Sequence, residues 1–253
     1  MKRIVLITLL GLLTATFSLS AQQVQFDEAN SLLEQGRFDE AASMYQSIAD
    51  SGYTSGALWL NMGIVYSRLD SLGMAKYCFL RAEQFDETEE RATEALRVVN
   101  DRFPRQSAVL PPLPWDRLIN YLSENIGVTT MAFFGLLFLY AAAAMIIGSW
   151  FRVDFRKALS RSGFTAIGIS LICFFLALVI RYQDSRYDTG VMIQNEAAVY
   201  AEPSGNSTVV STAYEGYSMK VDRNVSEERE EWSYVRLENG MYGWISEGAI
   251  RTF

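Results

Sequence analysis

Two long apolar runs on either side of a short basic segment constrain this sequence more than any other feature. The first run, residues 128–150, contains no charged residue, and at about 1.5 Å per helical residue it can cross a hydrocarbon core of about 30 Å. The second, residues 164–180, is near the short end of the spanning range, and Arg181 can snorkel at its end. The pattern predicts a transmembrane helical hairpin; a buried hairpin in a soluble helical protein is the alternative.

The segment between the two runs, residues 151–163, sets the predicted orientation. It contains four basic residues and one acidic residue. Short loops rich in Lys and Arg stay on the cytoplasmic side of a membrane, so this loop is predicted to be cytoplasmic and both flanking regions to lie across the membrane. Small residues spaced by four permit close helix contact, either within the hairpin or with other membrane proteins. They are Ala144, Gly148, Ala166 and Ser170.

The N-terminal segment, residues 1–21, has the organisation of a secretory signal peptide. Lys2 and Arg3 precede an apolar run, and small residues follow it. Cleavage is predicted after Ser20 or Ala21, and retention as an anchor is the alternative. In both cases the region that follows emerges on the far side of the membrane.

Residues 22 to about 89 contain an internal repeat with a spacing of 34 residues. The matching pairs are Ala29 with Gly63, Leu32 with Tyr66, Ala41 with Ala75, Tyr45 with Phe79, and Ile48 with Ala82. Small residues let paired helices approach while larger ones fill the space between them, so the pattern predicts two helical hairpins, at about 22–55 and 56–89. Thr88 is placed to cap a third helix, which completes an all-α domain over residues 22–103.

The second copy resembles a tetratricopeptide repeat. It contains Trp59, Met62, Gly63 and Tyr66, followed by Ala75, Phe79 and Ala82 at the spacing of that family. The resemblance implies that the first helix of each hairpin lines a concave binding face. The candidate partner contacts on that face are Asn30, Asn61, Ile64 and Arg68.

Residues 104–127 differ in composition from the segments on either side. Four prolines fall within residues 104–114, which disfavours helix and predicts a semi-rigid extended linker. Trp115 and the apolar residues that follow it suit a short amphipathic turn at the membrane interface. A simple linker is the alternative.

The C-terminal region, residues 190–253, alternates short β-rich runs with turn residues and predicts a small all-β barrel. The order Val199–Ser204, then Trp232–Val235, then Asn239–Ile245 resembles a bacterial SH3 (SH3b) domain. Tyr200 and Glu202 occupy positions where that family usually has Arg and Gly. The residues predicted to line the binding groove are Tyr200, Trp232, Tyr234, Tyr242 and Trp244.

The amino-acid composition gives little support to a catalytic function. The chain has no histidine, which excludes histidine-based triads and HExxH zinc sites, and no phosphate-binding loop is present. Cys78 and Cys173 are predicted to lie in different regions, one external and one within the membrane. We therefore expect no catalytic residue, metal or cofactor and a protein that is not an enzyme. Acidic outer segments, with sixteen acidic and nine basic residues over 22–126, also argue against nucleic acid as a partner.

The predicted fold class is a multidomain membrane protein with tetratricopeptide hairpins, a transmembrane α-hairpin and a C-terminal SH3-like barrel. This order of domains resembles the BatE proteins of the Bacteroides aerotolerance operon. The resemblance implies an inner-membrane accessory subunit with both outer domains periplasmic, beside von Willebrand factor A proteins and a MoxR-type ATPase. Two functions remain open: a scaffold for protein–protein interaction, or a sensor or tether whose SH3b domain binds peptidoglycan peptide.

Overall fold

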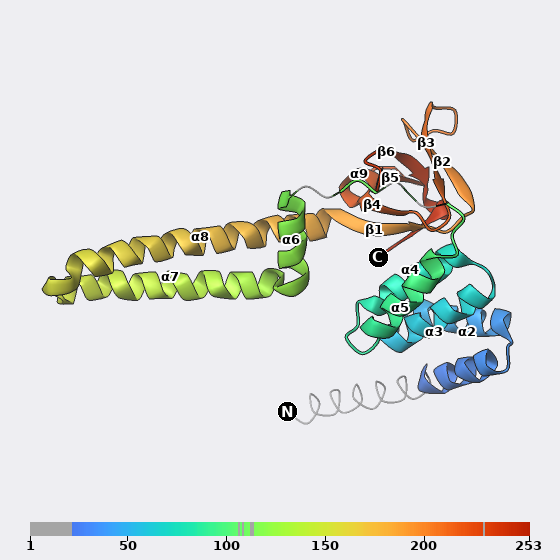
Figure 1. Ribbon diagram of the computed structural model, residues 1–253, viewed down its shortest axis with the longest axis horizontal. Coiled ribbons are helices and arrows are strands. Elements are labelled where there is room, and N and C mark those ends of the chain that lie inside the picture. Colours follow the sequence, from blue (N-terminus) through green and yellow to red (C-terminus); the bar gives the residue numbers. More distant parts are fainter. Residues whose placement is uncertain (1–21, 106, 108, 112–113, 230) are drawn as a thin grey trace, which may run out of the picture. The chain divides into compact units, whose positions relative to one another are not determined.

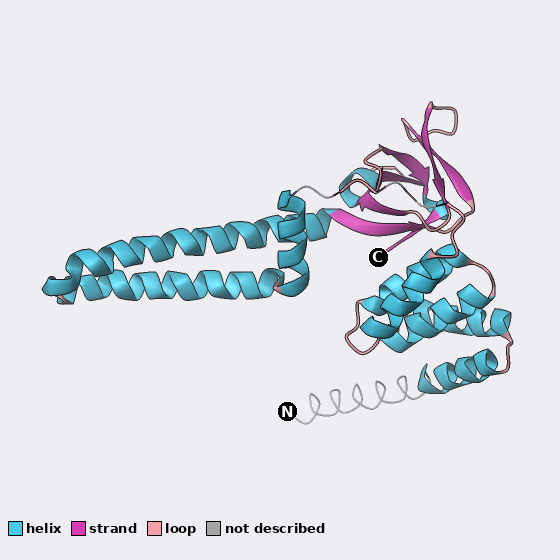
Figure 2. Ribbon diagram, in the orientation of Figure 1, coloured by secondary structure: helices cyan, strands magenta, loops and turns pink. Residues whose placement is uncertain are grey.

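The computed structural model describes residues 22–105, 107, 109–111, 114–229 and 231–253 (Figure 1). The predicted signal peptide lies outside these residues. The chain divides into two compact units, one containing the chain up to Ala108 and from Thr189 onward, the other Val109–Asp188. Within the described residues, the first part of the chain is helical and the strands follow Arg186 (Figure 2).

Among the residues that the structure describes, five helices form the N-terminal part of the first unit, which confirms the predicted helical region. They form two successive hairpins followed by one further helix. Their bounds are 22–34, α2 Phe38–Asp50, α3 Gly56–Arg68, α4 Leu72–Glu83 and α5 Glu89–Asn100.

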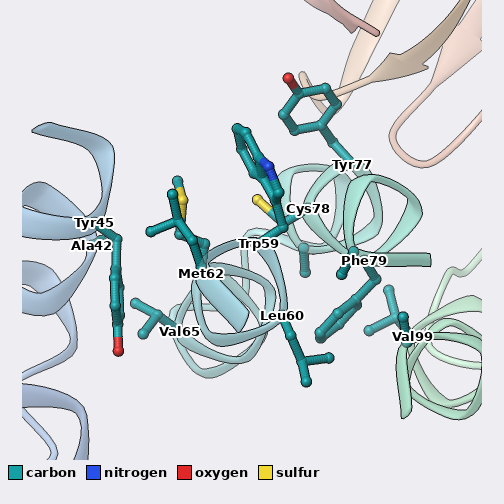
Figure 3. Close-up of a cluster of buried hydrophobic side chains, with 14 of the residues drawn as sticks. Ala42, Tyr45, Trp59, Leu60, Met62, Val65, Tyr77, Cys78, Phe79 and Val99 are labelled. Carbon is teal, nitrogen blue, oxygen red and sulfur yellow. The ribbon is translucent and has the colours of Figure 1, made fainter. Parts of the chain in front are cut away.

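The residues that recur at 34-residue spacing lie where the helices meet. Ala41 and Ala75 are completely buried. Gly63 packs so closely against α4 that a Cβ at this position would lie 2.5 Å from the ring of Phe79. Figure 3 shows Phe79 between α3 and α5, beside Leu60. Small residues therefore set the helix separation, and aromatic rings fill the remaining space.

Thr88 has a different role from the predicted helix cap. It precedes α5, but its side chain makes no capping hydrogen bond. The hydroxyl instead donates to the carbonyl oxygen of Ala82 at 2.7 Å, and the side chain packs directly against Gly56. Thr88 thus joins the end of α4 to the start of α3, because its buried hydroxyl needs an acceptor within the core.

In its described residues, the second unit contains three helices and a short turn. They are α6 Pro114–Asn125, α7 Gly127–Phe151, the 3₁₀ turn η1 Val153–Phe155 and α8 Arg156–Arg186. The helices α7 and α8 form an antiparallel hairpin (Figure 1), and both are long and apolar enough to cross a membrane.

The helix α8 is longer than the span of residues 164–180 that hydropathy predicts. It begins at Arg156, so that part of the predicted 151–163 loop is helical. Arg and Lys are good helix formers, and hydropathy marks only the apolar part of a helix. The basic residues of this segment therefore lie on the turn and on the first turns of α8.

Small residues bring α7 and α8 together. The hydroxyl of Ser170 donates to the carbonyl oxygen of Gly135 at 2.7 Å, and Ala166 is also buried. Two of the four predicted small residues thus pack the hairpin against itself, whereas Ala144 is exposed. Large apolar side chains also face outward, including Phe175 at 66% exposure, and such a surface suits lipid better than water.

The C-terminal part of the first unit is a seven-stranded antiparallel sheet in the order β3-β2-β6-β5-β4-β1-β7. Its core contains Val199, Val235 and Ile245, all completely buried. The strands are β1 Tyr187–Met192, β2 Glu196–Tyr200, β3 Val209–Tyr214, β4 Ser218–Asp222, β5 Trp232–Leu237, β6 Tyr242–Ser246 and β7 Ile250–Thr252; the short helices are α9 Arg223–Ser226 and η2 Glu247–Ala249.

Within the first unit, the sheet packs against α4. The carboxylate of Glu215 accepts a hydrogen bond from the backbone N–H of Gly73 at 2.7 Å. Lys76 Nζ donates to the carbonyl oxygen of Gly216 at 2.6 Å, and burial lowers the pKa of this lysine. Val191 of β1 belongs to the same buried cluster as the helices, and Tyr77 points from α4 toward the strands (Figure 3). The β1 side of the sheet is therefore covered within the chain.

Candidate ligand-binding surfaces

Strands β2, β5 and β6 carry aromatic side chains on the face turned away from the core of the sheet. In β5, Ser233 and Val235 are buried, whereas Trp232 and Tyr234 between them are partly exposed. Successive side chains of a strand point to opposite faces, so this alternation places the aromatic residues outside. We call the five outward residues of these strands the aromatic ladder: Tyr200, Trp232, Tyr234, Tyr242 and Trp244.

The strand register explains why the rings of the aromatic ladder touch. Trp244 of β6 lies opposite both Tyr200 of β2 and Tyr234 of β5. The ring centroids of Tyr234 and Trp244 are 5.2 Å apart, those of Tyr200 and Trp232 5.6 Å, and Tyr234 stacks on Tyr242 at 6.4 Å. The structure thus brings all five predicted groove residues into one surface, with Trp244 at its centre.

Two basic residues beside the aromatic ladder were missed by the sequence reasoning. Arg236 lies opposite Tyr242, with its guanidinium 5.3 Å from the centre of that ring. Lys220 of β4 lies opposite Arg236 and is exposed. The alternation along β5 that places Tyr234 on the outer face also places Arg236 there, two residues later. The sequence pattern therefore contained the information needed to predict the position of Arg236. One end of the aromatic surface is therefore basic.

This geometry agrees with a comparison of the sequence with known families. Residues 195–251 match the bacterial SH3 domain family. The C-terminal region is thus an SH3b domain. No curated protein matches the chain. SH3b domains bind proteins or peptidoglycan, and the aromatic ladder supplies flat apolar area with polar edges that suits either ligand.

Most of the partner contacts predicted on the helical domain are engaged in contacts within the domain itself. Asn61 Nδ2 donates to Asn30 Oδ1 at 2.8 Å, and the same oxygen accepts from the Tyr45 hydroxyl at 2.6 Å. Ile64 is half-buried against the helical core. Arg68 is exposed in the last turn of α3. Among these four candidates, Arg68 is therefore the most accessible to a partner.

The burial of the Tyr45 side chain makes the stability of the helical domain sensitive to alkaline pH. Burial raises the pKa of Tyr45 from 10.0 to about 12, so the folded state keeps the proton after the unfolded state has lost it. The stabilisation of the fold by the protonated Tyr45 side chain is complete below pH 10 and is lost as the pH rises toward 12. In urea unfolding at pH 9 and pH 11.5, the stability of the unaltered protein should fall by about 1–2 kcal/mol more than that of Tyr45→Phe.

Burial also raises the pKa of Tyr66, and this second tyrosine is present in both proteins. The difference between the two proteins therefore isolates Tyr45. Equal losses in both would contradict the assignment.

Reactive groups are sparse in the part of the chain that the structure describes. Cys78 is a free, completely buried thiol, and burial raises its pKa, which disfavours the nucleophilic thiolate. No group of three or more His, Cys, Asp or Glu side chains among the described residues is arranged to hold a metal ion. The binding surface of the SH3b domain is consequently the best candidate for function.

Proposed function

We propose that this protein is a non-enzymatic, membrane-anchored scaffold that presents two interaction modules on the periplasmic side of the inner membrane. The exposed aromatic ladder is the observation that carries the proposal. The β1 side of the SH3b domain is covered by α4 through Gly73 and Lys76, whereas the ladder includes Tyr242 at 49% exposure. A partly exposed cluster of Trp and Tyr is the composition that dominates binding energy at protein interfaces.

The helical hairpins act in this proposal as tetratricopeptide repeats. The 34-residue spacing supports this assignment, because Ala29, Gly63, Ala41 and Ala75 are all buried between helices. Two hairpins and a final helix meet the rough minimum for a stacked array. A second module on the same chain would raise the effective concentration of each module for one assembly.

The helices α7 and α8 anchor the scaffold by crossing the membrane. Their large outward apolar side chains, such as Leu171 at 64% exposure, support a lipid environment. Arg152, Arg156 and Lys157 are exposed at the turn, which favours a cytoplasmic turn with periplasmic outer domains. The predicted signal peptide agrees with this orientation.

Partners in this proposal are other membrane proteins. By the resemblance to the aerotolerance operon proteins they include von Willebrand factor A subunits and, indirectly, a MoxR-type ATPase. Peptidoglycan is the second candidate, since SH3b domains bind proteins or peptidoglycan. The acidic surface of the outer segments makes acidic wall polymers the less favourable ligand.

One set of experiments on the full chain separates these functions. The detergent-solubilised protein is incubated with purified wall sacculi, and native membranes containing it are cross-linked before affinity purification. The scaffold proposal expects membrane proteins in the cross-linked sample and no retention on sacculi. Retention on sacculi without membrane partners would replace it with the wall-binding function.

The same membranes test the orientation. Asp154 in the turn and Ser204 between β2 and β3 are both exposed, and each is replaced by cysteine in a Cys173→Ala background. An impermeant thiol reagent applied to intact cells with a permeable outer membrane should label the cysteine at 204 and spare the one at 154. The reverse pattern would overturn the proposed orientation.

A further inference from the structure

The helix α6 has one apolar face. Side chains separated by three or four positions share a face of a helix, so Leu118, Tyr121 and Leu122 lie together, with Ile119 at the margin. Asn120 lies on the opposite side, and Arg117 lies at the margin beside Tyr121; both are exposed. A twelve-residue helix of this kind is marginal alone in water and needs an apolar surface to cover it.

The second unit covers only part of that face. The helix α6 packs against both α7 and α8, and Ile119 and Leu122 are partly buried there. Leu118 and Tyr121, on the same face, remain 55% and 60% exposed. The helix α6 lies across the hairpin near the start of α7 (Figure 1). Large apolar side chains of the hairpin, such as Phe133 in the second turn of α7 at 61%, are exposed as well.

The position of α6 along the hairpin follows from the chain geometry. Gly127 has a φ of +73°, a left-handed conformation that glycine adopts without cost and that redirects the chain between α6 and α7. The 25 residues of α7 extend about 37 Å at 1.5 Å per residue, several ångströms more than a hydrocarbon core of about 30 Å. The end of α7 next to α6 therefore reaches the headgroup boundary, on the side opposite the basic turn.

We infer that α6 is an interfacial helix that lies in the membrane plane and inserts Leu118 and Tyr121 at the boundary between headgroups and acyl chains. The inference rests on the proposal that α7 and α8 span a bilayer. Lipid is the occupant that fits, because Leu118 and Tyr121 are exposed on a helix that packs against a hairpin with large outward apolar side chains. Asn120, on the opposite side of α6, is exposed and suits water. The helix would fix the depth of the hairpin.

The test uses the full chain with Cys173→Ala, reconstituted in vesicles of phosphatidylcholine and phosphatidylglycerol. Cys78 is completely buried and is left in place. Single cysteines at Leu118, Asn120 and Leu137 carry an environment-sensitive fluorophore; Leu137 lies near the middle of α7 and is exposed. Nitroxide lipids with the quencher high or low on the acyl chain, together with aqueous iodide, report the depth of each probe.

The expected result is a graded set of depths. The probe at 118 should be quenched most by the shallow nitroxide, the probe at 137 by the deep one, and the probe at 120 by iodide. A lipid-buried probe at 137 with a water-exposed probe at 118 would overturn the inference about α6 alone. Water exposure of both would overturn the membrane hairpin itself, so the two failures are distinguishable.

Discussion

Replacing Phe79 with alanine is expected to lower the free energy of unfolding of the helical domain by about 3–5 kcal/mol. The ring of Phe79 is 2% exposed and fills the space between α3 and α5. Its removal leaves a cavity, and the loss is a large fraction of the 5–15 kcal/mol that stabilises a typical protein. Hydrogen exchange of residues 56–83 measures the effect, with Val98→Ala at a half-exposed site of α5 as a control that should change little.

A double-mutant cycle with Gly63 tests the reason for this effect. Alone, Gly63→Ala should be destabilising, because the new methyl group would lie 2.5 Å from the Phe79 ring. In the Phe79→Ala background the methyl group enters vacated space, and the higher helix propensity of alanine, worth about 1 kcal/mol, becomes favourable. Additive effects of the two substitutions would show that Phe79 does not set the packing of Gly63.

Trp244→Ala is expected to weaken binding to the SH3b domain by at least about 30-fold, the equivalent of a 2 kcal/mol hot-spot residue. Trp244 lies opposite both Tyr200 and Tyr234, so its loss divides the aromatic ladder at the centre. The ligand is the one recovered with the unaltered protein, whether cross-linked membrane proteins or wall sacculi. Retained affinity would place the binding surface elsewhere.

A matched control keeps this result interpretable. Val210→Ala alters an exposed apolar residue of β3, outside the aromatic ladder, and should bind normally. Hydrogen exchange at Val235 and Ile245, both in the core of the SH3b domain, verifies that the Trp244 variant is folded.

Local patterns of the sequence predicted the helical repeat, the apolar hairpin and much of the candidate surface. They did not predict the full helix α6, because the prolines of residues 104–114 favoured an extended linker with only a short turn after it. Residues 34 apart, such as Ala41 and Ala75, are buried at equivalent helix contacts, because repeated packing requires repeated residue types. Likewise, the alternation of Trp232 and Tyr234 with buried Ser233 fixed the outward face of β5. In both cases the period of the secondary structure decides the orientation of a side chain.

Features that depend on distant parts of the chain could not be predicted in this way. Asn61 was selected as a surface contact, yet it donates to Asn30, 31 residues earlier. The contact of Lys76 with Gly216 spans 140 residues, and no short window of sequence contains both. Such contacts arise from tertiary packing, which periodicity does not encode.

The packing of the sheet against α4 has a consequence for the order of folding. The helical domain is synthesised first, but Val191, which completes its buried cluster, follows the 80 residues of Val109–Asp188. At 5–20 residues per second, translation of that segment takes about 4–16 s. During this interval the surface around Tyr77 lacks its covering strands, so the helical domain is most exposed to aggregation and proteolysis before the C-terminal domain is synthesised.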